Sequence, residues 1–349
     1  MMVGGLLLAL QTVLSPPASV DPFAFFRQSV VMTDDDRRQL DRGASIARIL
    51  PGQDQAIAVF AAVAVDIDGD RLVQWMRRIE ELKKSSYVLA IGRFSDPPRI
   101  EDLAGLALDD EELSAARQCR PGDCALKLSE AEMRELRRAA DEARAGWKPA
   151  LQQAFRQMIL RRVRTYLAQG QSALGPYEDG ERPVFPGARL TALVGHATFL
   201  DHLPGFATYL DEYPRLHMPS VESFLYWSKE RLASRATIGV THVSIVRSTA
   251  PGAPDVLVAG KQIFTTRYVN ASLGVTALIR GEPGQHAYLA YLNRSDVDVL
   301  GGTFGGIVRW FVQRRVKAEA ADVLVGLQHR LESGQPDPRP SREGSGSRP

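Results

Sequence analysis

The stretch HAYLAYLNRSDVDVLGGTFGGIVRWFVQRRVKAEAADVLVGLQHRL, residues 286–331, changes its hydrophobic period from two to about 3.6 near Gly305. Before Gly305, apolar and polar residues alternate, which predicts a strand at His286–Arg294. After it, apolar residues recur at helical spacing and would share one face: Ile307, Val308, Phe311, Val323, Leu324, Leu327 and Leu331. The stretch therefore predicts a last strand followed by a long amphipathic helix, Gly305–Glu332.

Further strands are predicted upstream, because alternating runs are separated by turn-forming residues. These strands are Glu222–Lys229, Ala236–Arg247, Val256–Tyr268 and Ala271–Arg280. Nearer the N-terminus the sequence predicts a hairpin (Ala44–Leu50 and Gln55–Val65), a helix (Arg71–Lys83) and a strand (Tyr87–Phe94). The segment at about 101–215 is predicted to be a mostly helical insertion, with a capping-box pattern at Ser129 and Glu132 and a break near Pro149.

These elements predict an α+β fold, in which a curved antiparallel sheet grips the long C-terminal helix. We expect one domain at 21–332 that contains the helical insertion. Residues 333–349 are rich in Gly, Ser, Pro and Arg and are predicted to be a disordered tail, because they have too little apolar surface to form a core.

Two segments resemble the START-like, or SRPBCC, helix-grip superfamily of lipid-transfer and polyketide-cyclase-type proteins. They are VFAAVAVDIDGDRLVQWMRRIEELKK, residues 59–84, and YLNRSDVDVLGGTFGGIVRWFVQRRVKAEAADVLVGLQHRLE, residues 291–332. The first has the strand, acidic turn and helix of that pattern, and the second has the last strand and the glycine-containing entry to the last helix. The resemblance implies a hydrophobic tunnel that shields a lipid, sterol or polyketide. It implies no conserved catalytic residue.

Composition and motifs exclude several other classes of function. The chain has 349 residues, 44% of them hydrophobic, and a formal net charge of +2, so no global field attracts nucleic acid. Walker, GxGxxG, HExxH and GxSxG motifs are absent from the sequence, and no cofactor or metal is expected. His196 and His202 are six residues apart and do not share a helical face. Gly301–Gly306 precedes a helix but lacks the GK[ST] ending, so a close-approach turn is favoured over a phosphate site.

The N-terminus and the cysteines bear on the compartment. Residues 1–20 begin with an apolar, uncharged run and continue with Pro and small residues, as a secretory signal does, but without a basic start. The alternative is a first helix packed on the domain. Cys119 and Cys124 enclose Arg-Pro-Gly-Asp, a turn that favours a disulfide in an oxidising compartment over free thiols or half a metal site. We expect a periplasmic or secreted protein, or a cytoplasmic one if the leader is not cleaved.

Candidate ligand-contacting residues are those that interrupt the apolar strand faces with a polar tip, together with their apolar neighbours. They are Val240, His242, Tyr268, Tyr288, Tyr291 and Phe311. His242 shares a strand face with apolar residues and is either a satisfied core residue or a ligand anchor and general base. The arginine-rich stretch at 134–164 is either a solvated helical face or a surface that contacts anionic lipid.

The sequence therefore favours an exported, non-enzymatic protein that binds or carries a hydrophobic, lipid-like molecule in an apolar cavity. A cyclase- or hydrolase-type enzyme that uses the same cavity, with His242 and a tyrosine as acid and base, is the alternative. A third possibility is an interaction module whose helical insertion docks a protein.

Overall fold

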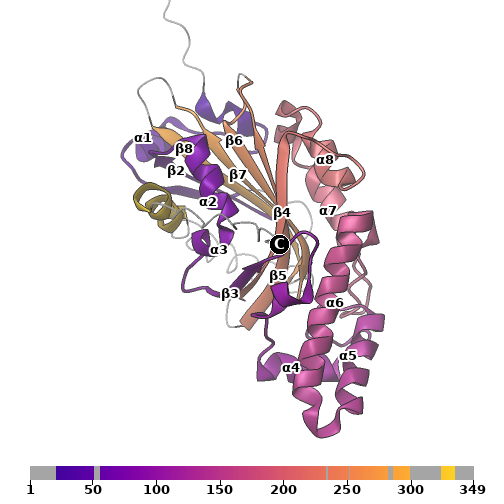
Figure 1. Ribbon diagram of the computed structural model, residues 1–349. Helices are drawn as coiled ribbons and strands as arrows, with labels where there is room; N and C mark the ends of the chain where they lie inside the picture. Colours follow the sequence, from indigo (N-terminus) through magenta and orange to yellow (C-terminus); the bar gives the residue numbers. More distant parts are fainter. Residues whose placement is uncertain are drawn as a thin grey trace, which may run out of the picture.

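The computed structural model describes residues 21–50, 56–232, 235–250, 252–281, 286–298 and 324–334. In this part of the chain, eight strands form one curved antiparallel sheet (Figure 1). The strands are β1 (Ile46–Leu50), β2 (Ala56–Val65), β3 (Val88–Arg93), β4 (Val221–Leu232), β5 (Arg235–Arg247), β6 (Val256–Thr265), β7 (Val269–Ile279) and β8 (Ala287–Val297). Their order is β1-β2-β8-β7-β6-β5-β4-β3, so the N-terminal strands add to both ends of the meander β4–β8.

Helices lie before the sheet, between β2 and β3, and between β3 and β4. The α-helices are α1 (Asp34–Asp41), α2 (Gly69–Arg77), α3 (Ile79–Leu82), α4 (Asp110–Gln118), α5 (Glu130–Glu142), α6 (Trp147–Gln169), α7 (Pro186–Gly195) and α8 (Phe206–Glu212). Short 3-10 helices are η1 (Pro22–Phe26), η2 (Ile100–Leu103), η3 (Arg144–Gly146), η4 (Gln171–Ala173) and η5 (Thr198–His202). Residues 324–333 are helical as well.

Local signals set the ends of the helices. Ser129 caps α5, and the reciprocal bonds of the capping box with Glu132 are both present, which confirms the prediction for this pair. The break between α5 and α6 falls at 143–146, and Pro149 lies in the first turn of α6, where a missing N–H breaks no helical bond.

One face of the sheet is covered by α2, α3 and the helical residues 324–333, and we call it the inner face (Figure 1). Leu72 of α2, Ile79 of α3 and Leu331 belong to the apolar cluster that packs on Val63 of β2 and Val243 of β5. The C-terminal helix is also tied to α2 by polar contacts. The Arg71 guanidinium donates to the carbonyl oxygens of Leu331 and Glu332.

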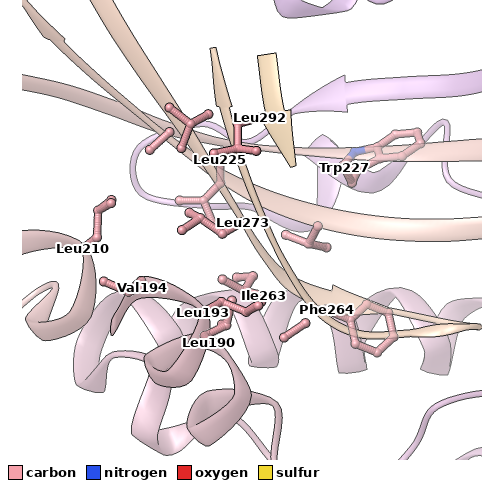
Figure 2. Close-up of a cluster of buried hydrophobic side chains, with 14 of the residues drawn as sticks. Leu190, Leu193, Val194, Leu210, Leu225, Trp227, Ile263, Phe264, Leu273 and Leu292 are labelled. Carbon is pink, nitrogen blue, oxygen red and sulfur yellow. The ribbon is translucent and has the colours of Figure 1, made fainter. Parts of the chain in front are cut away.

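The opposite face, which we call the outer face, is covered by η1 and by the helices between β3 and β4. Figure 2 shows Leu190 and Leu193 of α7 facing Ile263 of β6 and Leu273 of β7. Along β6 and β7 the outer-face residues are buried, including Leu257, Ala259, Ala271, Val275 and Ala277. Both faces of the sheet are therefore covered by helices, and this arrangement decides where a ligand site can lie.

The sequence-based strands agree with the structure to within three residues at each end. The predicted Val256–Tyr268 ends earlier, at Thr265, because Tyr268 has a φ of 65° and forms a turn before β7. Of the predicted helix Gly305–Glu332, the part from 324 onward is described, and it is helical and lies on the inner face. Residues 305–323, the proposed leader at 1–20 and the glycine-rich turn at 301–306 lie outside the described residues.

The predicted disulfide between Cys119 and Cys124 is present, with the two Cα atoms 4.4 Å apart. Arg120 and Asp123 exchange backbone hydrogen bonds of 3.1 and 3.0 Å, and Gly122 has a φ of 81°, which glycine adopts without steric cost. The turn within the loop therefore brings the cysteines together, as its composition predicts.

Several arginines of the helical insertion bind the protein itself. Arg156 donates to the Leu106 carbonyl oxygen over 2.8 Å, and Arg164 donates to the Pro98 carbonyl oxygen over 2.9 Å. These side chains fix loops to α6. Among the described helices, none combines the length and the apolar character needed to cross a bilayer.

Candidate functional site

The inner face becomes steadily more polar with distance from α2. Opposite residues of antiparallel neighbours share a face, so the register defines rows that run across the sheet. The row nearest α2 is apolar and consists of Val256, Leu278, Leu289 and Val63. Three rows further, the partners are Tyr226, Thr241, Gln262, Ser272 and Ser295. A second type of surface therefore begins where the apolar cover of α2 ends.

We call seven of these residues the inner-face patch. They are Tyr226, Thr241, Gln262, Ser272, Tyr291, Asn293 and Ser295, from β4, β5, β6, β7 and β8. Tyr226 and Ser272 are buried, and the other five are half-buried. The patch lies between two apolar clusters, the one under α2 and a smaller one that contains Ile57, Val59 and Val297.

Hydrogen bonds and glycines shape the patch. Asn293 Nδ2 donates to Ser272 Oγ over 3.0 Å, and Ser295 Oγ donates to Asn293 Oδ1 over 2.7 Å. A Cβ atom at Gly274 would come within 3.2 Å of the Tyr291 hydroxyl oxygen, so this glycine makes room for a long side chain to lie across the strand. The patch is thus a polar surface with hydroxyl, phenol and amide groups.

A lysine–glutamate pair borders the patch at its β4 end. Lys83, directly after α3, has its Nζ atom 2.6 Å from Glu230 Oε1 and 3.2 Å from the Tyr226 hydroxyl oxygen. Ser228 Oγ also donates to Glu230 Oε1 over 2.7 Å. These contacts place an ammonium and a carboxylate next to the phenol of Tyr226.

The ionisation of these groups is set by burial and by their partners. Burial raises the pKa of Glu230, but the Lys83 ammonium outweighs burial and the pKa lies below its usual value. Burial lowers the pKa of Lys83, but Tyr226 and Glu230 outweigh it and the pKa is raised. Burial raises the pKa of Tyr291. Near neutral pH the pair is charged and the Tyr291 phenol is protonated, so these groups are not poised to exchange protons.

A second polar cluster lies on the outer face, below the helical insertion. His242 Nδ1 is 2.7 Å from the Tyr166 hydroxyl oxygen, and the Tyr213 ring lies 4.4 Å from the His242 ring. Lys261, one strand away, donates to Gln171 Oε1 over 2.9 Å and to the Leu210 carbonyl oxygen. Burial lowers the pKa of Lys261 to about 7 and, with the Lys261 charge, lowers the pKa of His242.

A half-open cleft of about 360 Å³ lies beside this cluster, at the C-terminal end of α6. Gln171 links the two, because its Nε2 atom donates to Asp211 over 2.6 Å and to Thr191 over 2.8 Å, and both line the cleft. Lys261 is 1% exposed and does not line the cleft. The amine is therefore buried, is held by structural hydrogen bonds and does not reach the cleft.

The structure does not bring the sequence-predicted site residues together. Val240 and His242 lie on the outer face, and so does Tyr288, which donates to Asp41 over 3.1 Å. Tyr291 is on the inner face. Tyr268 is in the β6–β7 turn, and Phe311 lies outside the described residues. These residues therefore do not surround one cavity, as the sequence led us to expect, because they lie on two sheet faces that are both covered by helices. Strand alternation alone does not tell which face borders a cavity.

Sequence reasoning missed the polar residues of the inner-face patch and the lysine that borders it. The signal was present, because Thr241, Gln262, Ser272 and Ser295 each occupy an alternate strand position. Their alignment depends on the register of three strand pairs, which is a property of the assembled sheet. In the described part of the chain, no group of three or more His, Cys, Asp or Glu residues is placed to hold a metal ion.

Comparisons with known proteins leave the family open. No protein-family model matches the sequence, and no curated protein matches it. Among solved structures, the chain is similar to TTHA0849 from Thermus thermophilus at 13% identity and to the Zhui aromatase/cyclase from Streptomyces sp. R1128 at 15% identity. Each match covers 42% of this chain and 89% of the other, with a TM-score of 0.24. The di-domain ARO/CYC BexL from the BE-7585A biosynthetic pathway matches at 10% identity over 84% of this chain and 77% of its own, with a TM-score of 0.23. Scores of this size do not establish a common fold.

Proposed function

We propose that this protein binds a small amphipathic molecule on the inner face of its sheet. The inner-face patch is the observation that carries the proposal. On β6 and β7 the outer-face residues are buried. By contrast, Gln262 of the patch and Gly274, in the neighbouring row of the inner face, are half-buried. A partly open surface with hydroxyl, phenol and amide groups between two apolar clusters suits a ligand with an apolar body and several oxygen functions.

Binding is favoured over acid–base catalysis at this site. A general base works best with a pKa near the operating pH. The pKa of Glu230 is below its ordinary value and the pKa of Lys83 is above its ordinary value. His242, the base expected from the sequence, lies on the outer face against Tyr166. The patch therefore supports recognition of a ligand through fixed hydrogen-bonding groups.

A cyclase-type enzyme is the second candidate, and one contact favours it. The Lys83 Nζ atom lies 3.2 Å from the Tyr226 hydroxyl oxygen. An ammonium at this distance makes the phenol a better donor to a substrate carbonyl oxygen. In this version Tyr226 would orient and polarise a carbonyl group of the same ligand.

The strand order and the inner position of residues 324–333 support membership of the helix-grip class. We propose as well that the protein is exported. The apolar leader and the disulfide between Cys119 and Cys124 support this part of the proposal, because disulfides persist in oxidising compartments.

A neutral fluorescent probe tests the binding proposal. N-phenyl-1-naphthylamine should bind the purified protein at a single site. Gly260→Val should weaken that binding about tenfold or more, because the new side chain occupies space that a ligand needs. A Cβ atom there meets Thr241 Cγ2 at 3.4 Å, which is ordinary van der Waals contact, and a urea unfolding curve checks that the variant folds. Mass spectrometry of an organic extract of the native protein identifies the natural ligand.

Ser223→Ala is the matched control for Ser295→Ala, because Ser223 is an exposed strand serine outside the patch. Ser295→Ala should weaken the binding of a ligand that carries oxygen functions. Ser223→Ala should leave the affinity of the protein for the same ligand unchanged. If Gly260→Val folds and binds the probe as the wild type does, the ligand does not lie on the inner face.

A further inference from the structure

Arg267 is a buried arginine without an anionic partner in the described part of the chain. It is 5% exposed, and its Nε atom is buried without a hydrogen-bond partner. The other buried lysines and arginines of the described chain each have an acceptor: Lys127 pairs with Asp298, Arg162 with Glu132 and Lys229 with Glu112, and Lys261 donates to two carbonyl oxygens. Arg267 is thus an exception to a rule that this protein otherwise follows.

A second unpartnered group lies on β5, close to Arg267 along the backbone. Gly239 pairs with Thr265, and Thr266 N donates to the Ile238 carbonyl oxygen over 2.9 Å. Thr237 and Arg267 are the chain neighbours of the residues in this hydrogen bond, so their backbones lie close together where β6 ends. Thr237 is 4% exposed, and its Oγ1 atom is also buried without a partner.

Thr237 belongs to the inner face, two rows beyond Thr241 of the inner-face patch. Along β5, residues 237, 239 and 241 alternate onto the same side of the strand. Arg267 follows the end of β6 beside this part of β5, so it adjoins the inner-face patch on its β5–β6 side. The two unpartnered groups are therefore continuous with the surface assigned to the ligand.

Neighbouring carboxylates do not neutralise Arg267. Glu230, the partner of Thr237 across β4 and β5, is bound to Lys83. Asp298, whose backbone N–H donates to the Tyr268 carbonyl oxygen, is bound to Lys127. A buried guanidinium without a partner is unfavourable, and a bound oxyanion would relieve that cost with bidentate hydrogen bonds.

We propose that the ligand of the inner face carries an oxyanion, such as a carboxylate, sulfonate or phosphate, that binds to Arg267 and Thr237. This inference rests on the proposed function and specifies the class of ligand. The apolar body of the ligand lies along the inner-face patch, and its anionic end lies at the β6–β7 turn.

Two probes that differ by one sulfonate test the inference. They are 8-anilinonaphthalene-1-sulfonate and its neutral parent, N-phenyl-1-naphthylamine. Arg267→Gln should weaken the binding of the sulfonate probe about 10- to 100-fold, which is the range for charge-assisted hydrogen bonds. The affinity for the neutral probe should stay within about twofold of the wild-type value. Arg267→Lys should restore part of the affinity, since it keeps the charge and loses the planar fork.

Arg294→Gln is the matched control. Arg294 is a half-buried strand arginine on the outer face that donates to Ser29 over 3.2 Å, and its Nε atom also lacks a partner. Its substitution should change neither affinity. If Arg267→Gln binds both probes as the wild type does, or if Arg294→Gln alone loses the sulfonate probe, the assignment to Arg267 is wrong while the proposed function stands. If the wild type binds neither probe, both proposals fail.

Discussion

The Nζ atom of Lys261 donates to Oε1 of Gln171 over 2.9 Å, so a cation on the outer face of the sheet is tied to the turn that follows α6. The ammonium also donates to the Leu210 carbonyl oxygen, next to α8. Burial lowers the pKa of Lys261 to about 7 from 10.5, and the nearby Asp211 carboxylate offsets part of this decrease. The contact between sheet and insertion therefore contains a group that titrates differently in the folded and unfolded states.

The first prediction concerns the pH dependence of stability. Between pH 7 and pH 10.5 the unfolded Lys261 binds a proton that the folded residue has lost, so the contribution of Lys261 to stability increases with pH. The slope for one such group is at most about 1.4 kcal/mol per pH unit. Urea unfolding of the wild type and of Lys261→Met across this range should show the wild type gaining stability relative to the variant.

Lys148→Met provides the control, because Lys148 is an exposed lysine paired with Asp110 at the surface. This variant removes a surface lysine and leaves the buried amine in place, so a pH-dependent difference that Lys261→Met shows and Lys148→Met lacks belongs to the buried site. If the difference in the free energy of unfolding between Lys261→Met and the wild type does not depend on pH, the pKa of Lys261 is not lowered in the folded protein.

The second prediction concerns the buried ion pair of α5 and α6. Arg162 contacts Glu132 through two hydrogen bonds of 2.6 and 2.5 Å, and both side chains are largely buried. Glu132→Gln leaves the guanidinium without a counter-charge and should lower the free energy of unfolding by about 3–5 kcal/mol. Denaturant titration measures this loss. The double variant Glu132→Leu with Arg162→Met should recover most of it, and equal losses in both variants would argue against the pair as the cause.

The same pair predicts a response to acid. Burial raises the pKa of Glu132, but Arg162 outweighs it and the pKa is lowered overall. A carboxyl group with a lowered folded pKa stabilises the protein above its unfolded pKa, and this stabilisation is lost as the pH falls through the folded pKa. The stability of the wild type should therefore decrease with acid more steeply than that of the double variant.

The third prediction concerns the disulfide. Cys119 and Cys124 close a short loop, for which the chain-entropy estimate of the stabilisation is about 2 kcal/mol. Reduction should lower the free energy of unfolding of the wild type by about this amount, and denaturant titration with and without reductant measures the change. The double variant Cys119→Ser with Cys124→Ser should match the reduced protein and should not respond to a reductant. A reductant effect of equal size in that variant would point to another cause.

The fourth prediction concerns close packing at α7. A Cβ atom at Gly187 would lie 2.1 Å from the Gln171 carbonyl oxygen, which is a backbone atom. Gly187→Ala should therefore destabilise the protein by about 1–3 kcal/mol, the usual cost of overpacking. At Gly180 nothing lies within 4 Å of the corresponding position, so Gly180→Ala should have little effect on the thermal midpoint. Similar midpoints for both variants would contradict the contact.

Local sequence determined the features that depend on near neighbours. The capping box of Ser129 and Glu132 and the turn between Cys119 and Cys124 follow from residues within a few positions of one another. The same holds for the strands, whose alternation appears within each segment. These interactions form between adjacent residues whatever the rest of the chain does, so the sequence predicts them directly.

Tertiary structure decided where the candidate site lies. Both sheet faces are covered, so the alternation in β5 did not show which helices lie over His242 and which over Thr241, and only the packing of the folded chain decided it. Lys83 meets Glu230 across 147 sequence positions, and Thr241 meets Gln262 only in one strand register. Such contacts depend on which surfaces the folded chain brings together, and no short segment contains that information.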